Sequence, residues 1–113
     1  MSSVTRASPL RTAHVNLGTT PSSLGSNTLV AVSDTKRIRV LSAVVITTLA
    51  NAVKFQSAAN DITATFPLGA NGGLVLPFNE HGWFQTNAGE ALNINLGTAT
   101  ATAVQLQYIV LGS

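Results

Sequence analysis

The chain ends in a long uncharged run, because no Asp, Glu, Lys, Arg or His follows Glu90. Within this run apolar and amide side chains alternate, first over 92–96 (LNINL) and again over 104–110 (VQLQYIV). A period of two places apolar groups on one face of a strand and polar groups on the other. A membrane helix would instead need about 20 predominantly apolar residues. We therefore predict two paired strands, a β-hairpin with a neutral outer face, and no membrane span.

The neutrality of that outer face has a consequence for partners. A solvated surface ordinarily carries roughly 25–35% charged side chains, whereas only 9% of this chain is charged. A neutral face of this size suggests a surface that another protein covers. We expect Gln105 and Gln107, on the outer face of the last strand, to lie in a subunit contact.

Short alternating segments separated by Gly, Pro and Asn recur along the chain, and no segment has a convincing helical pattern. Eight or nine short strands with turns every eight to twelve residues indicate a β-sandwich or small barrel. We predict an all-β, antiparallel β-sandwich over 11–113, preceded by an extended N-terminal arm over 1–10. Before the final pair, strands are expected over 13–17, 27–33, 37–48, 53–57, 62–66, 74–78 and 83–86. Pro77 should place its strand at an edge or mark its end.

The longest expected strand, 37–48, has a middle (LSAVVITTL) that is apolar on both faces. Its β-branched block disfavours a helix. A strand that is apolar on both faces is buried on both sides, either in a sandwich corner or beneath a neighbouring subunit. This predicts a second set of subunit-contact residues, namely Leu41, Ala43, Val45 and Thr47.

Composition excludes several classes of function. Cysteine is absent, which removes disulfides, thiolate metal sites and cysteine nucleophiles. A formal charge of +2 is too small an excess to indicate nucleic-acid binding, and the cluster of Lys36, Arg37 and Arg39 is interpreted as a solvated turn. The N-terminus has no apolar core like that of a secretory signal. We expect a soluble protein made in the cytoplasm of the producing cell.

Catalytic and metal-binding patterns are also missing. Glu80 and His81 are adjacent in a turn, but a metal site needs three or four converging ligands. No GxSxG elbow surrounds any serine, and Gly72-Gly73 belongs to no phosphate-binding motif. The sequence therefore predicts a protein that is not an enzyme and that holds neither a metal nor a cofactor.

The only tryptophan, Trp83, lies in the segment GWFQT. A lone tryptophan flanked by phenylalanine is more often a core anchor because of its large buried area, so we expect Trp83 in the core. The alternative is an exposed platform for carbohydrate, which Asn79, His81 and Trp83 would form together.

About the last 40 residues (GGLVLPFNEHGWFQTNAGEALNINLGTATATAVQLQYIVL) resemble a pattern found in small tailed-bacteriophage virion proteins. That pattern is a strand ending in LP, a turn, GWF, a polar link, GEAL, an alternating strand and a closing strand ending near Tyr. The matching residues are Leu76-Pro77, Gly82-Trp83-Phe84, Gly89-Glu90-Ala91-Leu92 and Tyr108.

The resemblance implies a jelly-roll-like β-sandwich in a phage particle, most similar to head decoration (cement) proteins. It further implies a homotrimer on the capsid exterior, assembled in the host cytoplasm, with the major capsid protein as partner. The N-terminal arm, through Arg6 and Arg11, would contact the capsid. The alternative within the same class is a head-fibre or tail module that binds host-surface carbohydrate.

Overall fold

The computed structural model describes residues 13–31 and 35–112 of the 113-residue chain. This part of the chain is all-β, with ten strands and no helix. The strands are β1 (Val15–Thr19), β2 (Gly25–Val30), β3 (Arg37–Thr47), β4 (Asn51–Ser57), β5 (Asn60–Asp61), β6 (Phe66–Leu68), β7 (Gly73–Leu76), β8 (Phe84–Gln85), β9 (Leu92–Leu96) and β10 (Thr102–Leu111). Within that part of the chain, no helix is long and apolar enough to cross a membrane.

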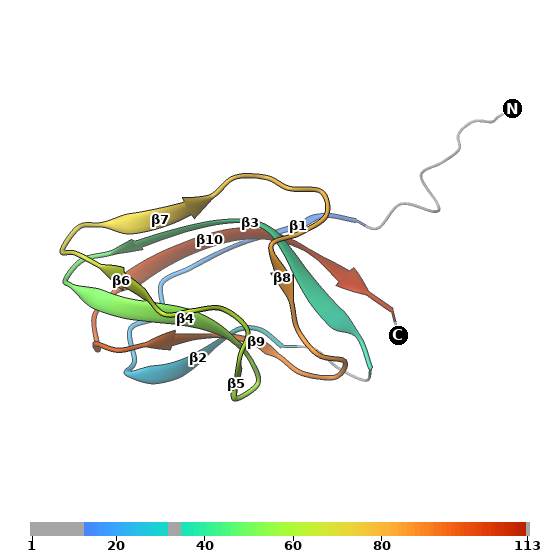
Figure 1. The fold of residues 1–113 in the computed structure, drawn as a ribbon, viewed down its shortest axis with the longest axis horizontal. Coiled ribbons are helices and arrows are strands. Elements are labelled where there is room, and N and C mark those ends of the chain that lie inside the picture. Colours follow the sequence, from blue (N-terminus) through green and yellow to red (C-terminus); the bar gives the residue numbers. More distant parts are fainter. Residues whose placement is uncertain (1–12, 32–34, 113) are drawn as a thin grey trace, which may run out of the picture.

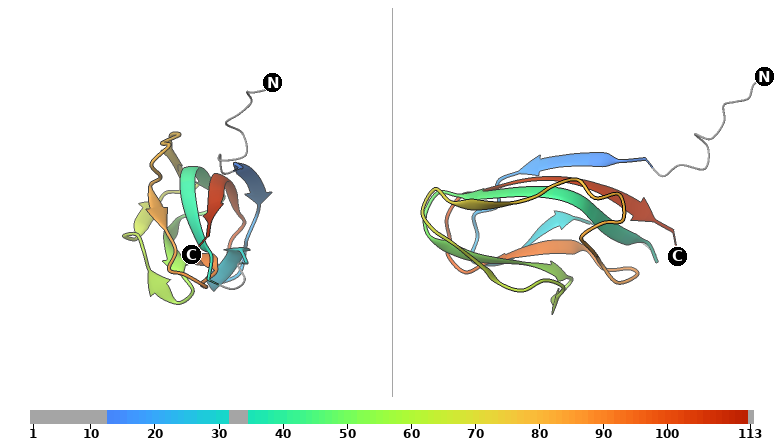
Figure 2. Two further views of the ribbon diagram at one scale, coloured as in Figure 1. Left: turned by 90° about the vertical axis from the view of Figure 1, so that its right-hand side faces the viewer. Right: turned by 45° about the horizontal axis from the view of Figure 1, so that its top comes forward.

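The strands form two antiparallel sheets that pack face to face (Figures 1 and 2). In the first, here called the β1 sheet, the order is β1-β10-β3-β7, and β8 also pairs with β3. In the second, the β2 sheet, the order is β2-β9-β4-β5, and β6 also pairs with β4. The predicted all-β, sandwich-like class is confirmed for the described residues, whereas the predicted arm over 1–10 lies outside them.

The two last strands do not form the predicted hairpin. Strand β9 pairs with β2 and β4, whereas β10 pairs with β1 and β3, so the chain crosses from one sheet to the other between them. The crossing link is held in place because Gly97 N–H donates to the Ala52 carbonyl (2.8 Å) and Thr98 N–H donates to Asn51 Oδ1 (2.9 Å). The alternation along each strand is real, but it places the apolar faces of β9 and β10 toward each other across the core.

A β-bulge explains why 37–48 has apolar residues on both faces. Strand β10 pairs Gln107 with Ser42 and Tyr108 with Val40, so Leu41 is an extra residue on β3. An extra residue reverses which side chains face inward. Val40 is buried before the bulge and Ala43 after it, and Leu41 itself is only 1% exposed. The core-facing residues of β3 are therefore Ile38 and Val40 before the bulge and Ala43 and Val45 after it, with the outward positions in between.

The core lies between the sheets and combines aliphatic side chains from both with one aromatic pair. Phe55 on β4 is fully buried, and its ring centroid lies 4.8 Å from that of Phe84 on β8. Thr86 follows Phe84 in the chain and is also fully buried, where its hydroxyl accepts from the Ile38 N–H (2.9 Å). Inward-facing residues of β3, β4, β9 and β10 thus form one buried cluster between the two sheets.

One predicted strand is absent. The segment 62–65 is not a strand, and only the short β5 and β6 on either side of it pair with β4. Thr63 explains the interruption, because its hydroxyl accepts from the Phe55 N–H (3.0 Å) where a strand partner's carbonyl would otherwise do so. Strand β7 ends at Leu76, immediately before Pro77, as the proline predicts.

Candidate functional site: the outer face of the β1 sheet

Strand register places a row of uncharged side chains on the outer face of the β1 sheet. Residues directly opposite each other in an antiparallel pair share a face. Gln105 on β10 lies opposite both Gly18 on β1 and Val44 on β3, and Val44 lies opposite Val75 on β7. The row thus crosses all four strands without a charged side chain.

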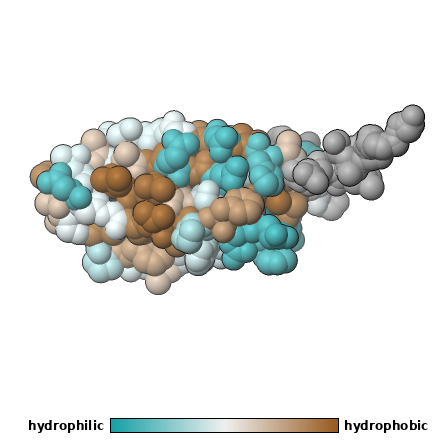
Figure 3. Space-filling view, turned by 90° about the horizontal axis from the view of Figure 1, so that it is seen from above, coloured by the Kyte–Doolittle hydropathy of each residue, from teal (hydrophilic) through white to brown (hydrophobic). Residues whose placement is uncertain are grey.

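Large apolar side chains are exposed on this face. Val75 is 66% exposed and Ile46 is 51% exposed. The half-buried Val44 lies opposite Val75 and two residues before Ile46 on β3. Leu49, in the turn that follows β3, is 56% exposed. Figure 3 looks onto this face and shows a brown apolar patch toward the end where β3 meets β7. A contiguous apolar patch on a small domain marks an interaction site.

A shallow groove of about 340 Å³ lies beside the patch, and it follows β10 between β1 and β3. Gly18 opens this groove, since the Cβ of any other residue there would approach Gln105 Oε1 to 2.6 Å. The Gln105 side chain therefore lies across the strand where a side chain on β1 would otherwise stand. The groove is lined by Gly18, Thr19, Thr20, Val44, Ile46, Ala103, Val104 and Gln105.

The predicted subunit-contact residues separate into two groups. Gln105 is exposed and Gln107 is half-buried, both on the outer face. The other four, namely Leu41, Ala43, Val45 and Thr47, are at most 1% exposed inside the domain itself. The bulge buries Leu41 and turns Ala43, Val45 and Thr47 inward, so the side chains that β3 offers to a neighbour are instead Val44 and Ile46.

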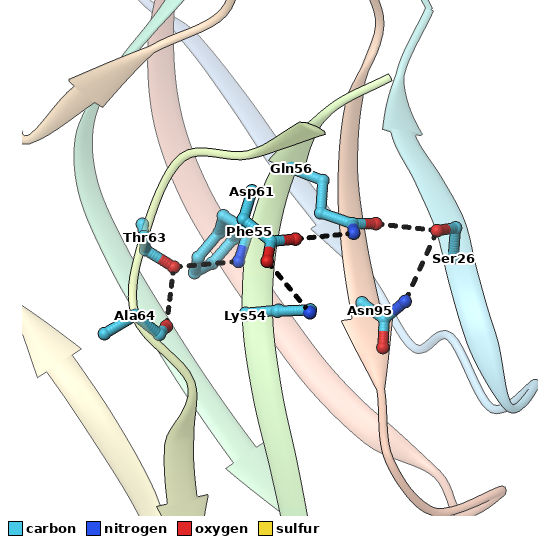
Figure 4. Close-up of polar contacts among 8 residues, drawn as sticks. All are labelled: Ser26, Lys54, Phe55, Gln56, Asp61, Thr63, Ala64 and Asn95. Atoms are coloured by element: carbon cyan, nitrogen blue, oxygen red, sulfur yellow. Dashed lines mark hydrogen bonds and ion pairs between the residues drawn. The ribbon is translucent and has the colours of Figure 1, made fainter. Parts of the chain in front are cut away.

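The outer face of the β2 sheet has the opposite character, because its side chains are hydrogen-bonded to each other (Figure 4). Ser26 on β2 donates to Gln56 Oε1 on β4 (2.6 Å), and Gln56 Nε2 donates to Asp61 Oδ1 (2.9 Å). Lys54 forms an ion pair with the other oxygen of Asp61 at 3.1 Å. The Gln56 hydrogen bond, followed by that of Lys54, lowers the pKa of Asp61 below its ordinary value of 3.8. Most of the polar side chains described on this face are hydrogen-bonded within the domain, whereas Asn93 Oδ1 is buried without a hydrogen-bond partner.

A second polar cluster fixes the loop between β8 and β9. The buried Ser57 hydroxyl donates to Glu90 Oε1 and accepts from the Asn87 N–H (2.9 Å), while Asn87 Nδ2 donates to the same Glu90 oxygen (3.1 Å). These hydrogen bonds, that of Ser57 first, lower the pKa of Glu90 below its ordinary value of 4.5. The Glu90 carboxylate thus accepts hydrogen bonds that hold this loop in place, which is a structural role.

The aromatic prediction is corrected by the structure. Trp83 is 43% exposed, and its indole N–H donates to the Pro77 carbonyl at 2.7 Å. The core ring of this segment is its neighbour Phe84, whose ring packs against that of the buried Phe55. Asn79 Oδ1 accepts from the His81 N–H (2.9 Å), which folds the 79–82 turn beside Trp83. The predicted trio of Asn79, His81 and Trp83 therefore lies on one exposed turn.

The remaining predicted residues, Arg6 and Arg11, lie outside the described residues. Within the described ranges, no group of three or more His, Cys, Asp or Glu side chains is close enough together to hold a metal ion. The apolar patch was not predicted as such, since Val44, Ile46 and Val75 are ordinary strand residues in sequence. Only the register and the bulge bring them together on the outside.

The fold and the face together define a class: an all-β, sandwich-like domain with one apolar and one polar outer face. Comparison with models of protein families, with curated proteins and with solved structures finds no match for the chain.

Proposed function

We propose that this protein is a structural virion component, a decoration (cement) protein that binds the exterior of an assembled phage head through the outer face of its β1 sheet. The observation that carries the proposal is the difference between the two outer faces. One presents exposed Val75 and Ile46 in an uncharged surrounding, and the other is a hydrogen-bonded polar network. A domain with two such faces suits a layer, with one side covered and the other in solvent.

The strand order supports a jelly-roll assignment within the sandwich. A jelly roll has eight strands in two four-stranded sheets and is common in viral capsid and lectin domains. Strands β5 and β6 both pair with β4 on one side and together take a single strand position. Strand β8 pairs with β3 off the main strand order, so each sheet is four strands wide. Successive strands β1 to β4 alternate between the two sheets. Fold alone does not decide the role, so the face carries the functional argument.

The mechanism needs no catalytic residue. A protein that binds only the assembled shell stabilises it by mass action. Specific interfaces bury about 800 Å² per partner, and a few well-packed apolar residues supply most of the binding energy. The exposed Val75 and Ile46 would provide this apolar centre, with Gln105 and Gln107 at its rim. The proposed partners are the major capsid protein and two further copies of this chain in a homotrimer.

The proposed capsid contact of the N-terminal arm is separate from the face. Arg6 and Arg11 would add charge-assisted contacts to an acidic shell surface. Deleting residues 1–10 should then weaken retention on particles while leaving the oligomeric state unchanged. An unchanged retention would remove the arm from the proposal.

The face is tested with a pair of matched substitutions. Val75→Asp places a charge in the centre of the apolar patch, whereas Leu24→Asp places one at an equally exposed position (67% against 66%) in the link that precedes β2. We expect Val75→Asp to abolish trimer formation in light scattering and particle retention, and Leu24→Asp to retain both. A wild-type protein that is a monomer and is found in virions only at tail copy number would overturn the proposal.

A further inference from the structure

A second exposed feature lies at the other end of the β1 sheet, away from the apolar patch. A hollow of about 180 Å³ is lined by Arg39, His81, Gly82, Trp83, Phe84 and Gln85. Its volume is below the roughly 300–1,000 Å³ that is typical of pockets for drug-sized ligands. It therefore suits a single small ring bound at the surface.

Three side chains with different chemistry share the outer side of the β3–β8 pair. Arg39 lies opposite Gln85 in the register, and Trp83, which comes immediately before β8, lines the same hollow as both. The Phe84 side chain between them points into the core against Phe55. A guanidinium, an amide and an indole are thus presented side by side, with His81 in the adjoining turn.

These groups are held in place by contacts within the domain. Arg39 Nε donates to Gln85 Oε1 at 3.0 Å, and the indole N–H of Trp83 donates to the Pro77 carbonyl at 2.7 Å. Gly82, whose φ is +83°, makes room for the arginine, because a Cβ there would approach Arg39 Cγ to 2.5 Å. The guanidinium and the ring are therefore ordered before any ligand binds, which reduces the entropy cost of binding.

The N–H donors that remain available on Arg39 and Gln85 indicate which chemical groups a ligand should carry. The Nε contact leaves the terminal guanidinium nitrogens of Arg39 with N–H groups, and no carboxylate of the described residues forms an ion pair with Arg39. Arginine binds carboxylates through such paired N–H groups. Gln85 Oε1 is occupied by Arg39, which leaves the Gln85 amide N–H₂ as a donor toward a hydroxyl. The exposed Trp83 ring offers an apolar face with a negative quadrupole, which packs against polarised C–H groups.

We propose that Arg39, Trp83 and Gln85, with His81 at the rim, form a binding site for a carboxylated sugar. The sugar's apolar C–H face stacks on Trp83, its carboxylate binds the Arg39 guanidinium, and a hydroxyl accepts from Gln85. The site lies on the same sheet as the apolar patch but at its other end, and none of its residues lines the groove beside Val44 and Ile46. Failure of either proposal therefore leaves the other standing.

The test uses glucuronate against glucose, two probes that differ in the carboxylate. Because Trp83 is the only tryptophan, its fluorescence reports binding directly. We expect saturable change with glucuronate and at least about tenfold weaker binding of glucose, a difference of about 1.4 kcal/mol. Arg39→Gln should remove this preference, and Lys54→Gln, the same charge change on the β2 sheet, should keep it.

A second variant keeps the test valid if Arg39→Gln fails to fold. Trp83→Phe keeps a ring, and binding to it can be followed by chemical shifts of the Gln85 side-chain amide. It should bind glucuronate more weakly without losing the preference over glucose. Equal binding of glucose and glucuronate to the wild-type protein, or no saturable response to either sugar, would overturn the proposal.

Discussion

The rings of Phe55 and Phe84 lie 4.8 Å apart at centroid, with their planes tilted by 35°, and join the two sheets across the core. Phe55 comes from the middle of β4 and Phe84 from the two-residue strand β8. The 77–86 segment is held on the domain by this aromatic contact, by the buried Thr86, and by backbone hydrogen bonds from the N–H groups of Asn79, Trp83 and Thr86 to carbonyls of β3. The segment includes the exposed Trp83, and the proposed sugar site therefore depends on a core contact directly beneath it.

This contact predicts a large effect of truncating Phe55. Phe55→Ala should lower the free energy of unfolding by about 3–5 kcal/mol, the usual cost of removing a buried aromatic ring. Phe78→Ala is the control, since Phe78 is 54% exposed, and it should cost less than about 1 kcal/mol. Urea denaturation followed by circular dichroism measures both. Equal losses for the two variants would contradict the assignment of Phe55 to the core.

The bulge at Leu41 makes a prediction that distinguishes core from interface. Leu41→Ala should lower the free energy of unfolding by about 2–4 kcal/mol, because a buried leucine leaves a cavity. Val75→Ala should change it by less than about 0.5 kcal/mol, because Val75 is mostly exposed. The comparison is made at a protein concentration where the chain is monomeric. A neutral Leu41→Ala would place this residue outside the core.

The Glu90 cluster predicts a specific pH dependence. The pKa of Glu90 is lowered in the folded state by the Ser57 and Asn87 hydrogen bonds. A lowered folded-state pKa contributes stability that is fully present above the unfolded pKa, near 4.5, and is lost as the pH falls through the folded value. The free energy of unfolding of the wild type should exceed that of Glu90→Gln by a constant amount between about pH 6 and 8. This difference should become smaller below about pH 4.5. A difference that stays constant down to pH 3 would show that the cluster does not favour the charged form.

Ser57 is the buried member of that cluster, and its removal tests the loop. Ser57→Ala leaves the Asn87 N–H without its acceptor and removes one of the donors to Glu90, whereas Asn87 Nδ2 still donates to it. We expect a loss of about 1–3 kcal/mol in the free energy of unfolding, the cost of an unsatisfied buried group. Amide exchange should accelerate most at Asn87. Unchanged exchange there would mean that water replaces the hydroxyl without cost.

Gly18 gives a prediction for the proposed interaction face. Gly18→Val fills the groove and displaces the Gln105 side chain, which is flexible, so folding stability should change by less than about 1 kcal/mol. Association should nevertheless weaken at least tenfold, because the groove loses its shape. Sedimentation at several concentrations measures association, and thermal unfolding measures stability. Undiminished association of a folded Gly18→Val protein would place the contact elsewhere.

Local pattern was sufficient to predict most strands. Period-two alternation correctly indicated β1, β3, β4, β9 and β10, and Pro77 correctly marked the end of β7. The pattern failed at 62–66, where Thr63 takes a backbone bond that a strand would need. It failed again at Trp83, because alternation fixes that Trp83 and Phe84 face opposite ways but leaves open which of them faces the core.

The sequence by itself determined that this chain is all-β, that its strands are short, and that its surface is nearly uncharged, because these properties depend on residue type and on a period of two. Only the tertiary structure decided that β9 and β10 belong to different sheets and that Leu41 interrupts the alternation of β3. Those two facts depend on which strand each backbone pairs with, a choice made by contacts between distant residues. They turn Ala43 and Val45 inward, leave Val44 and Ile46 outside, and so create the face on which the proposed function rests.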